Sequence, residues 1–481
     1  MRRLLLLLVT LAGLPLTLTS LALMGPACGS GGGGGSGKGG GKGGGSGGGT
    51  GVGFTVMALD PDKPYTIDPH ADPDTYLAIA VDPANERVGV AYFMPDGTRM
   101  TAPGDGGVMT DHTNYALKYV EYNKGVVSTP EKIRIMQRLE GLSVAFEPIS
   151  GDPVVAYLGG SDHFIQGESI FWFQHEAVFA RRSGGTWTQT IVAEDSGDVP
   201  GGNNVSDLGF LVGLWPSVLF DSDGKLYFTY RDCHQGEFPQ QDWGGSDVEL
   251  WSGTPGGLSG TMLVAGGKDK QGYGGHLQLV MGETQPGLSF DLLPVTPDGP
   301  GRNVYFMERL ANGTWSDAQS IYGTPDTGWG PSLAFDPTEG FGVAIGAGST
   351  LSYINRNPQT KQWSSSVQTI YGAGSGGWYP SLAMDPVYHE PAIAFYICHP
   401  SKQDVAASDC PNAQNELRVS QKKAGNWQAD VVDPEGGFSP KLGFFNSGKR
   451  FVVYRHPKAL DQSTGLPINE NVGVLKIAVE Q

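Results

Sequence analysis

The segment Pro331-Ser-Leu-Ala-Phe-Asp-Pro337 decides the fold, because it returns as Pro380-Ser-Leu-Ala-Met-Asp-Pro386 and, more loosely, elsewhere along the chain. A second apolar run follows each copy, such as Pro391-Ala-Ile-Ala-Phe-Tyr396. The Asp-Pro pair between the two runs supplies a side-chain acceptor and a fixed φ, which a type I turn favours. The repeat therefore predicts a β-hairpin that recurs along the chain.

A third and a fourth run follow each hairpin. Val304 to Arg309, for example, leads through Asn312-Gly313 to Trp315, and Asn-Gly between alternating runs is a strong hairpin signal. First strands near residues 77, 142, 216, 277, 332, 381 and 440 give about seven such units. We therefore expect residues 54–481 to form an all-β propeller of about seven four-stranded antiparallel blades. A six-bladed ring, with the unit near residue 277 as an insertion, is the alternative.

Both ends of this region favour ring closure. The last unit ends at its third strand, and a spare strand, Phe54 to Leu59, lies at the other end. We expect the spare strand to complete the last blade and so lock the ring. One tryptophan recurs near the start of the fourth strand, and we expect packing between blades rather than sugar stacking for Trp187, Trp315, Trp363 and Trp427.

The first 27 residues read as a signal peptide, with a basic start, an apolar run to about Leu23 and small residues before Cys28. The segment from Leu23 to Ser30 resembles a bacterial lipobox, which implies a lipidated Cys28 and a membrane anchor. Residues 28–53 are nearly all Gly and Ser, so we expect a flexible tether with a reach of about 25–30 Å. The chain is thus expected to be exported and lipid-anchored in the cell envelope, at the outer membrane or cell surface. An incidental Cys28 in an ordinary secretory signal is the alternative.

The charge of the chain limits which partners it can bind, and its cysteine content limits which disulfides it can form. The net charge of −17 disfavours nucleic acid as a partner, and we expect a monomer. Export makes disulfides possible. Cys398 and Cys410 flank one predicted loop, so we expect them to pair, which leaves Cys233 odd.

The candidate site lies in the loops from second to third strand, which open on one face of a propeller. We expect these loops at about 93–114, 158–175, 231–247, 293–303, 397–415 and 455–471. They hold six of the nine histidines, a larger share than uniform scatter would give. The residues that fall in them are His112, His163, His175, His234, His399 and His456.

Two chemistries are open for this face. A divalent metal could be a cofactor, bound by imidazoles with Asp162 or Asp232. The candidate metal ligands are His163, His234, His399 and His456. Alternatively, Arg231 and Arg455 could clamp a carboxylate, with His163 and His399 as further ligand contacts. The third alternative is that these groups only bond to loop backbone and water.

The region from about 54 to 481 resembles exported bacterial propellers of the sialidase-like kind, through the hairpin repeat. That resemblance implies an arginine clamp on a carboxylated sugar, and Arg231 and Arg455 match two clamp arginines by location. The Ser-x-Asp-x-Gly-x-x-Trp box typical of sialidase blades is absent from the sequence. The resemblance therefore concerns the repeat and no catalytic motif.

Three functions remain. The first is an envelope lipoprotein whose propeller binds a glycan, peptide or protein ligand on its loop face. The second is a sialidase-like, glycoside-active enzyme, with Asp162, Asp232 and Glu237 as candidate acids. The third is a purely structural role in the envelope.

Overall fold

The expected propeller is confirmed. The computed structural model describes residues 52–60, 65–66, 77–103, 109–136, 141–164, 171–194, 211–233, 246–265, 271–294, 303–322, 329–347, 350–371, 376–398, 415–434, 436–457 and 472–481. These residues form seven antiparallel sheets, numbered here as blades 1 to 7 in chain order, and contain no helix. Accordingly, the described part of the chain offers no helix that could span a membrane.

Each blade begins with its innermost strand and pairs it with a second strand. The innermost strands are β3 (Leu77–Asp82), β8 (Leu142–Phe146), β12 (Leu211–Phe220), β16 (Gln271–Met281), β20 (Trp329–Asp336), β24 (Gly376–Met384) and β28 (Phe438–Phe444). The second strands are β4 (Arg87–Pro103), β9 (Pro153–Phe164), β13 (Leu226–Cys233), β17 (Pro286–Pro294), β21 (Gly340–Ala347), β25 (Pro391–Cys398) and β29 (Arg450–Pro457). The weak unit near residue 277 is therefore a full blade, and the six-bladed alternative is wrong.

The third and outer strands complete the sheets. The third strands are β5 (Met109–Asn123), β10 (Phe171–Ser183), β14 (Asp247–Thr254), β18 (Val304–Glu308), β22 (Thr350–Asn355), β26 (Asn415–Lys423) and β30 (Val472–Glu480). The outer strands are β6 (Val126–Val127), β11 (Thr186–Ala193), β15 (Gly257–Val264), β19 (Gln319–Tyr322), β23 (Gln368–Tyr371), β27 (Asn426–Asp433) and β1 (Phe54–Ala58). Two further strands, β7 (Glu131–Met136) and β2 (Tyr65–Thr66), pair with β5 and β30.

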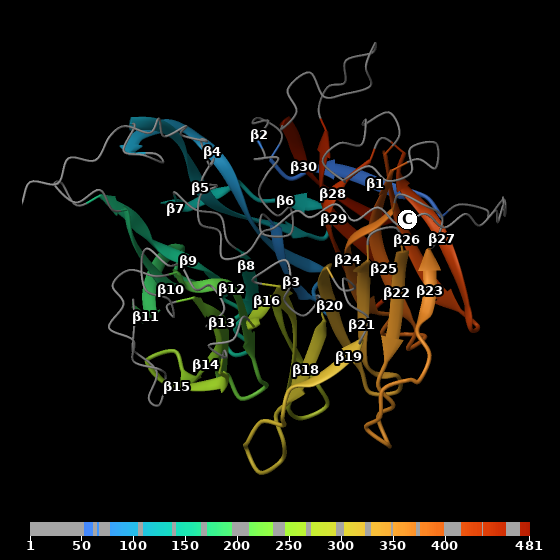
Figure 1. Cartoon of the computed structure of the whole chain (residues 1–481). Coiled ribbons are helices and arrows are strands. Elements are labelled where there is room, and N and C mark those ends of the chain that lie inside the picture. The colour runs from blue at the N-terminus through green and yellow to red at the C-terminus, as the bar shows by residue number, and fades with distance from the viewer. Residues whose placement is uncertain are drawn as a thin grey trace, which may run out of the picture.

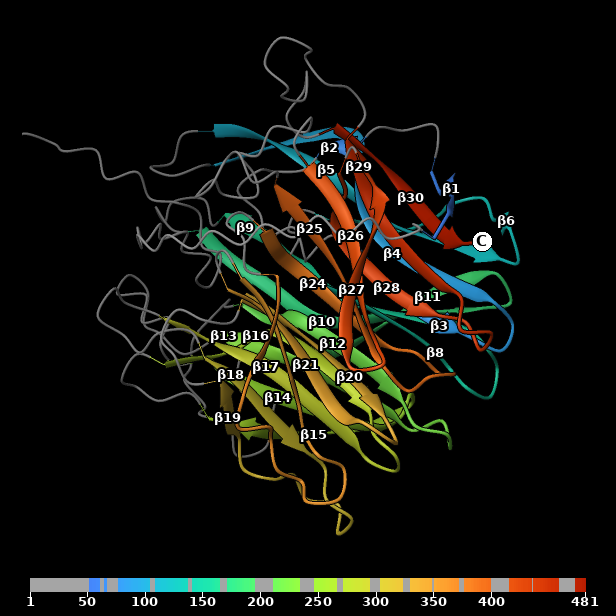
Figure 2. The ribbon, with the colours of Figure 1, turned by 90° about the vertical axis from the view of Figure 1, so that its right-hand side faces the viewer.

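The two ends of the propeller interlock as expected. Strand β1 pairs antiparallel with β30, with Phe54 opposite Glu480, and the two lie side by side in both views (Figure 1, Figure 2). Just past β1, Asp60 accepts hydrogen bonds from Tyr92 Oη (2.8 Å) and Lys118 Nζ (2.7 Å) of blade 1. The N-terminal strand thus belongs to blade 7, and the residue Asp60 just after it is bonded to blade 1, so this end of the chain joins the last blade to the first.

The recurring aspartate and tryptophan have the expected structural roles. Asp336 Oδ1 accepts from the N–H groups of Thr338 (2.7 Å) and Glu339 (3.1 Å), which fixes the turn into β21. Trp427 of blade 6 packs edge-on against Tyr353 of blade 5, with ring centroids 5.5 Å apart. The hydrophobic clusters lie between neighbouring blades and include the other recurring tryptophans, Trp187, Trp315 and Trp363.

The serine of the repeat joins each blade to the next. A side-chain oxygen at this position accepts the N–H of the next innermost strand, a set that we call the inner ring. Among the described residues, its bonds run from Val218 N to Ser143 Oγ (3.0 Å), from Leu279 N to Ser217 Oγ (2.9 Å), from Leu333 N to Gln278 Oε1 (2.7 Å), from Leu382 N to Ser332 Oγ (2.9 Å) and from Leu442 N to Ser381 Oγ (2.9 Å). The inner ring therefore connects blades 2 to 7 in sequence.

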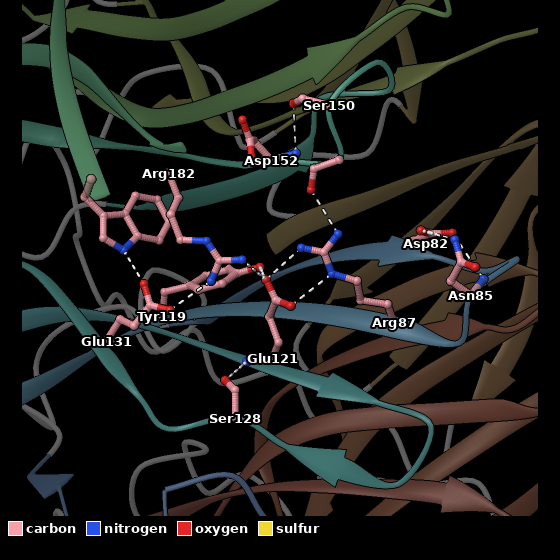
Figure 3. A network of polar contacts seen from close by, with 12 residues as sticks. Asp82, Asn85, Arg87, Tyr119, Glu121, Ser128, Glu131, Ser150, Asp152 and Arg182 are labelled. Atoms are coloured by element: carbon pink, nitrogen blue, oxygen red, sulfur yellow. Dashed lines mark hydrogen bonds and ion pairs between the residues drawn. The ribbon is translucent and has the colours of Figure 1, made fainter. Parts of the chain in front are cut away.

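A polar network joins blades 1 and 2, where the inner ring has no bond among the described residues. Figure 3 shows Glu121 between two arginines. Arg87 donates to Glu121 at 2.7 and 3.0 Å and to Gly151 O at 2.9 Å. Arg182 of blade 2 donates to Glu121 (2.7 Å) and Glu131 (2.9 Å) of blade 1. Because these groups are partly buried and share one carboxylate, the network holds the two blades together.

Two of the segments that the sequence predicts as loops are mostly strand, so these two predictions are wrong in large part. Residues 93–103 and 109–114 continue strands β4 and β5, and residues 158–164 and 171–175 continue β9 and β10. A register shift between Pro95 and Arg99 accommodates the Pro-Asp-Gly stretch inside β4. Because a bulge tolerates turn residues, a sequence that reads as a loop here extends the hairpin.

Candidate functional site

A bulge recurs near the start of the innermost strands. In blades 3, 4 and 7 the strand register shifts between Leu214 and Ser217, Gly275 and Gln278, and Phe438 and Lys441. The non-glycine residues in these bulges have positive φ, and we call them the bulge residues: Trp215 (44°), His276 (48°) and Ser439 (47°). Such conformations cost about 1–3 kcal/mol each and gather at functional sites. The bulges therefore mark a candidate site.

A charged side chain of the second strand faces each bulge residue. Arg231, Asp291 and Arg455 occupy matching places in β13, β17 and β29, opposite the bulges in the strand register. Their exposed fractions are 1 %, 0 % and 0 %. Buried charges are rare in proteins unless a partner offsets the loss of hydration. Three blades thus repeat one arrangement with different side chains.

In blade 3 the pair is aromatic and cationic. The Arg231 guanidinium carbon lies 5.3 Å from the Trp215 ring centroid, within cation–π range. The Trp215 ring also lies 5.7 Å from the His276 ring, which joins blades 3 and 4. The indole Nε1 is buried and has no hydrogen-bond partner among the described residues. That buried N–H is therefore a donor whose hydrogen-bonding capacity is unused among the described residues.

In blade 4 the pair is an imidazole and a carboxylate. His276 Nδ1 lies 2.9 Å from Asp291 Oδ2. A carboxylate at Nδ1 orients the ring and favours the tautomer with the proton on that nitrogen. Any contact of this ring with a ligand must then be made through Nε2. Such an oriented imidazole can accept or donate a proton.

In blade 7 the pair is a guanidinium and a hydroxyl. Arg455 Nη2 donates to Ser439 Oγ at 2.6 Å, and burial lowers the pKa of Arg455 to about 9. Beside it, Asp433 Oδ2 accepts from Tyr454 Oη (2.8 Å) and lies 2.9 Å from His456 Nδ1. The guanidinium remains charged at neutral pH, in a place where burial disfavours its charge.

The bulges of blades 3 and 4 border a cavity on the propeller axis. Its volume is about 200 Å³, and residues from all seven innermost strands line it, including Trp215 and His276. Gly141 and Gly330 take the bulge positions in blades 2 and 5. A Cβ on Gly141 would lie 2.8 Å from Trp215 Cα, so only glycine fits there. We call this end of the cavity, at Gly141, Trp215, His276 and Gly330, the axial mouth; it lies at the loop face because second strands end beside it.

Only some of the sequence-predicted residues have described side chains. Arg231 and Asp232 lie buried at the end of β13, and Arg455 and His456 at the end of β29. Asp162 and His163 lie within β9, opposite Phe173 and Trp172 of β10, rather than in a loop. Predictions for the signal peptide, the tether and the following residues fall outside the described residues: Cys28, His234, Glu237, His399 and Cys410. The pairing of Cys398 with Cys410 is therefore still a prediction.

The candidate acid Asp232 lies in a carboxylate-rich patch. It faces Asp247 across β13 and β14, and the two are 4 % and 0 % exposed. Next to them, Glu249 accepts a hydrogen bond from Tyr230 Oη, and burial together with the Glu249 charge raises the pKa of Tyr230. Among the residues that the structure describes, no group of three or more His, Cys, Asp or Glu side chains could hold a metal ion.

Sequence reasoning missed Trp215, His276 and Asp291. It searched the loops, whereas the first two lie inside innermost strands. A signal did exist: the residue before the Pro-Ser or equivalent pair is Gly141 and Gly330 in two repeats but a large side chain in blades 3 and 4. The signal was weak, because Tyr379 of blade 6 and Ser439 of blade 7 also stand at this position, so the variation alone did not single out Trp215 and His276.

No family model and no curated protein sequence matches the chain. Similar solved structures include a sialidase of Trypanosoma rangeli in complex with sialic acid, at 9% identity and a TM-score of 0.42, with 84% of this chain covered. They also include an α-L-arabinofuranosidase of Fusarium graminearum with arabinobiose (12%, TM-score 0.43, 90% of this chain and 98% of that chain). An ulvan lyase is similar at 12% identity and a TM-score of 0.48, covering 89% of this chain and 93% of that chain. The chain spans 59% of the length of the sialidase. None of these likenesses assigns an activity to this chain.

Proposed function

We propose that this chain is a lipid-anchored envelope protein whose propeller binds a carboxylated glycan at the axial mouth. The observation that carries the proposal is the placement of the buried Arg231 guanidinium against Trp215, a bulge residue at the axial mouth, while Arg455 lies against Ser439, the matching bulge residue of blade 7. An anion near a buried guanidinium offsets the hydration that the charge has lost. Arginine also matches a carboxylate with two parallel hydrogen bonds.

Local charge matters here because the whole chain is acidic. A net charge of −17 repels an anionic ligand at long range, so binding needs a cationic site at short range. Arg455 supplies such a charge, and its pKa, lowered to about 9 by burial, should rise again when a carboxylate binds. Trp215 adds a buried indole N–H that can donate to a sugar oxygen.

Anchoring follows from the N-terminal sequence. We place lipid on Cys28, with residues 29–53 as a tether that holds the propeller away from the headgroups. Cys28→Ser should abolish labelling of the expressed chain by a clickable palmitate analogue. Labelling that persists in the variant would refute the anchor while leaving the ligand proposal untouched.

Binding is tested with oligomers of glucuronate and of glucose, by isothermal titration. We expect the purified protein to bind the glucuronate oligomer and to bind the glucose oligomer at least tenfold more weakly. Arg455→Lys keeps the charge but loses the planar fork, so affinity for the uronate should fall about tenfold. Trp215→Phe keeps a ring but removes the N–H, and we expect a fall of about five- to tenfold.

The measured affinities decide whether the proposal holds. Equal affinity for the charged and neutral oligomers, or unchanged affinity in both variants, would overturn the proposal. Ser259→Ala, on an exposed position of β15, is the matched control and should bind as the unmodified protein does.

One observation favours an enzyme as the second candidate, namely the His276 and Asp291 pair beside the axial mouth. An imidazole oriented by a carboxylate is suited to proton transfer, which contributes about 10²–10⁴-fold to a rate. Should the protein cleave glucuronate oligomers, His276→Gln would lose turnover and keep binding. If the unmodified protein binds glucuronate oligomers and does not cleave them, only the binding function is supported and the enzyme is ruled out for this substrate.

A further inference from the structure

The turns that join the first and second strands carry a histidine in one blade. Four of these turns begin with Asp-Pro or Glu-Pro, and the fifth residue of each has a positive φ: Glu86 in blade 1, Gly151 in blade 2, Gly340 in blade 5 and His389 in blade 6. His389 has a φ of 58°, and its N–H donates to Asp385 O at 2.9 Å. This left-handed conformation favours glycine over residues with a side chain. The contacts of the His389 side chain should therefore offset its unfavourable backbone conformation.

The His389 ring crosses the boundary between blades 5 and 6. Its Nδ1 lies 2.8 Å from Oδ2 of Asp336, which begins the matching turn of blade 5. The other oxygen of Asp336 accepts from two backbone N–H groups of its own turn, so this carboxylate fixes one turn and bonds to the next. The Asp336 side chain is 5% exposed and the His389 side chain 44%. A buried carboxylate is thus paired with an imidazole that water can reach.

The matching aspartate of blade 6 has a different partner. Asp385 holds its turn through the N–H groups of Val387 and Tyr388, at 2.8 and 3.1 Å. Its second oxygen accepts from the Gln421 amide of the same blade at 2.8 Å. An amide does not change its charge with pH, whereas an imidazole does so between about pH 5 and 8. The second oxygen of Asp336 is therefore bonded to a titratable group, where that of Asp385 is bonded to a neutral one.

The charges around His389 favour the protonated ring. The hydrogen bond and the charge of Asp336 raise the pKa of His389, and the charge of Asp385 adds to this effect. The other acids of the two turns are Glu339 and Glu390, and Glu390 accepts from a backbone N–H at 2.9 Å. Because the pKa is raised in the folded protein, the stabilisation by the pair is complete below the usual histidine pKa of about 6.5. It is lost as the pH rises through the raised pKa.

We propose that His389 and Asp336 form a pH-sensitive clasp between blades 5 and 6. In mildly acidic medium the imidazolium and the carboxylate make a charge-assisted hydrogen bond, and in alkaline medium the neutral ring makes an ordinary, weaker one. The two blades are thus held together more firmly in acid. The clasp lies where the innermost strands β20 and β24 end, whereas the axial mouth lies where they begin. It does not depend on the glycan proposed for the mouth, so either proposal can fail without the other.

The first test measures the pKa of the His389 ring directly. Isotope-labelled histidine is followed by NMR as a function of pH in the full chain and in Asp336→Asn, and His389→Asn assigns the signal. Asp336→Asn keeps an oxygen for the turn and removes the charge. We expect a His389 pKa above its usual value in the unmodified protein and a lower pKa in Asp336→Asn. An equal pKa in the two proteins would overturn the clasp. If Asp336→Asn does not fold, a pKa at or below the usual value in the unmodified protein would do the same.

The second test is a double-mutant cycle with Asp336→Asn and His389→Asn, because asparagine tolerates the positive φ of the turn. Urea unfolding of the four proteins at about pH 5.5 and about pH 8.5 gives the coupling between the two side chains at each pH. We expect the pair to favour the folded state by about two- to fivefold at the lower pH, as partly exposed ion pairs do, and by less at the higher pH. Coupling that is equal at both pH values, or larger in alkaline medium, would contradict the clasp.

Discussion

Ser217→Ala tests the inner ring, the contact that explains why the repeat carries serine. Ser217 is 4 % exposed, and its Oγ accepts the N–H of Leu279 in the next blade at 2.9 Å. The substitution removes the acceptor and leaves a buried donor without its bond, which costs about 1–3 kcal/mol. Unfolding entropy of about 2 cal/mol/K per residue, over a propeller of this size, converts that cost into a fall in Tm of only about 1–3 °C.

Chemical denaturation is therefore the better assay for this change. We expect the free energy of unfolding of Ser217→Ala to fall by about 1–3 kcal/mol relative to the unmodified protein, measured by tryptophan fluorescence in urea. Ser259→Ala, which removes an exposed hydroxyl of β15, is the matched control and should stay within about 0.5 kcal/mol. If both variants lose the same stability, the hydroxyl of Ser217 does not join the blades and the reasoning fails.

Two other predictions concern the mouth and the network of Figure 3. Gly141→Ala places a Cβ 2.8 Å from Trp215 Cα at a φ of +100°. The free energy of unfolding should therefore fall by about 1–3 kcal/mol, and the affinity for the uronate should fall as well. An unchanged free energy of unfolding together with an unchanged affinity would contradict this packing. Glu121→Gln should destabilise by about 1–3 kcal/mol at pH 7. The pKa of Glu121 lies below its usual value, because the hydrogen bonds from Arg87 and Tyr119 outweigh the opposing effect of burial. The stabilisation by the Glu121 carboxylate is therefore present at neutral pH and is lost as the pH falls below the usual glutamate pKa. The two proteins should converge in stability under acid, and a gap that widens there would be contrary to the assignment.

The number of blades and the closing strand could be predicted because each leaves a signal in short stretches of sequence. The Asp-Pro turn and the glycine-rich hairpins define each unit locally, and the spare strand at Phe54 has one place to pair. The weak unit was predicted by its spacing, although Leu277 to Met281 lacks the proline and aspartate of the other copies.

The candidate site was predicted only in part, because it depends on contacts between strands. Arg231 and Arg455 were found since each follows a tyrosine at the end of a second strand. His276 was passed over, because its role comes from a bulge in an innermost strand and from Asp291, 15 residues further along the chain. Neither the bulge nor the cross-strand pair follows from local propensity.

The structure of the purified protein in complex with a glucuronate oligomer tests the central claim most directly. We predict that the sugar occupies the axial mouth, with its carboxylate within hydrogen-bond distance of Arg231 or Arg455 and an oxygen accepting from the Trp215 N–H. A sugar bound on the outer strands or on the opposite face, with the axial mouth empty, would contradict the account.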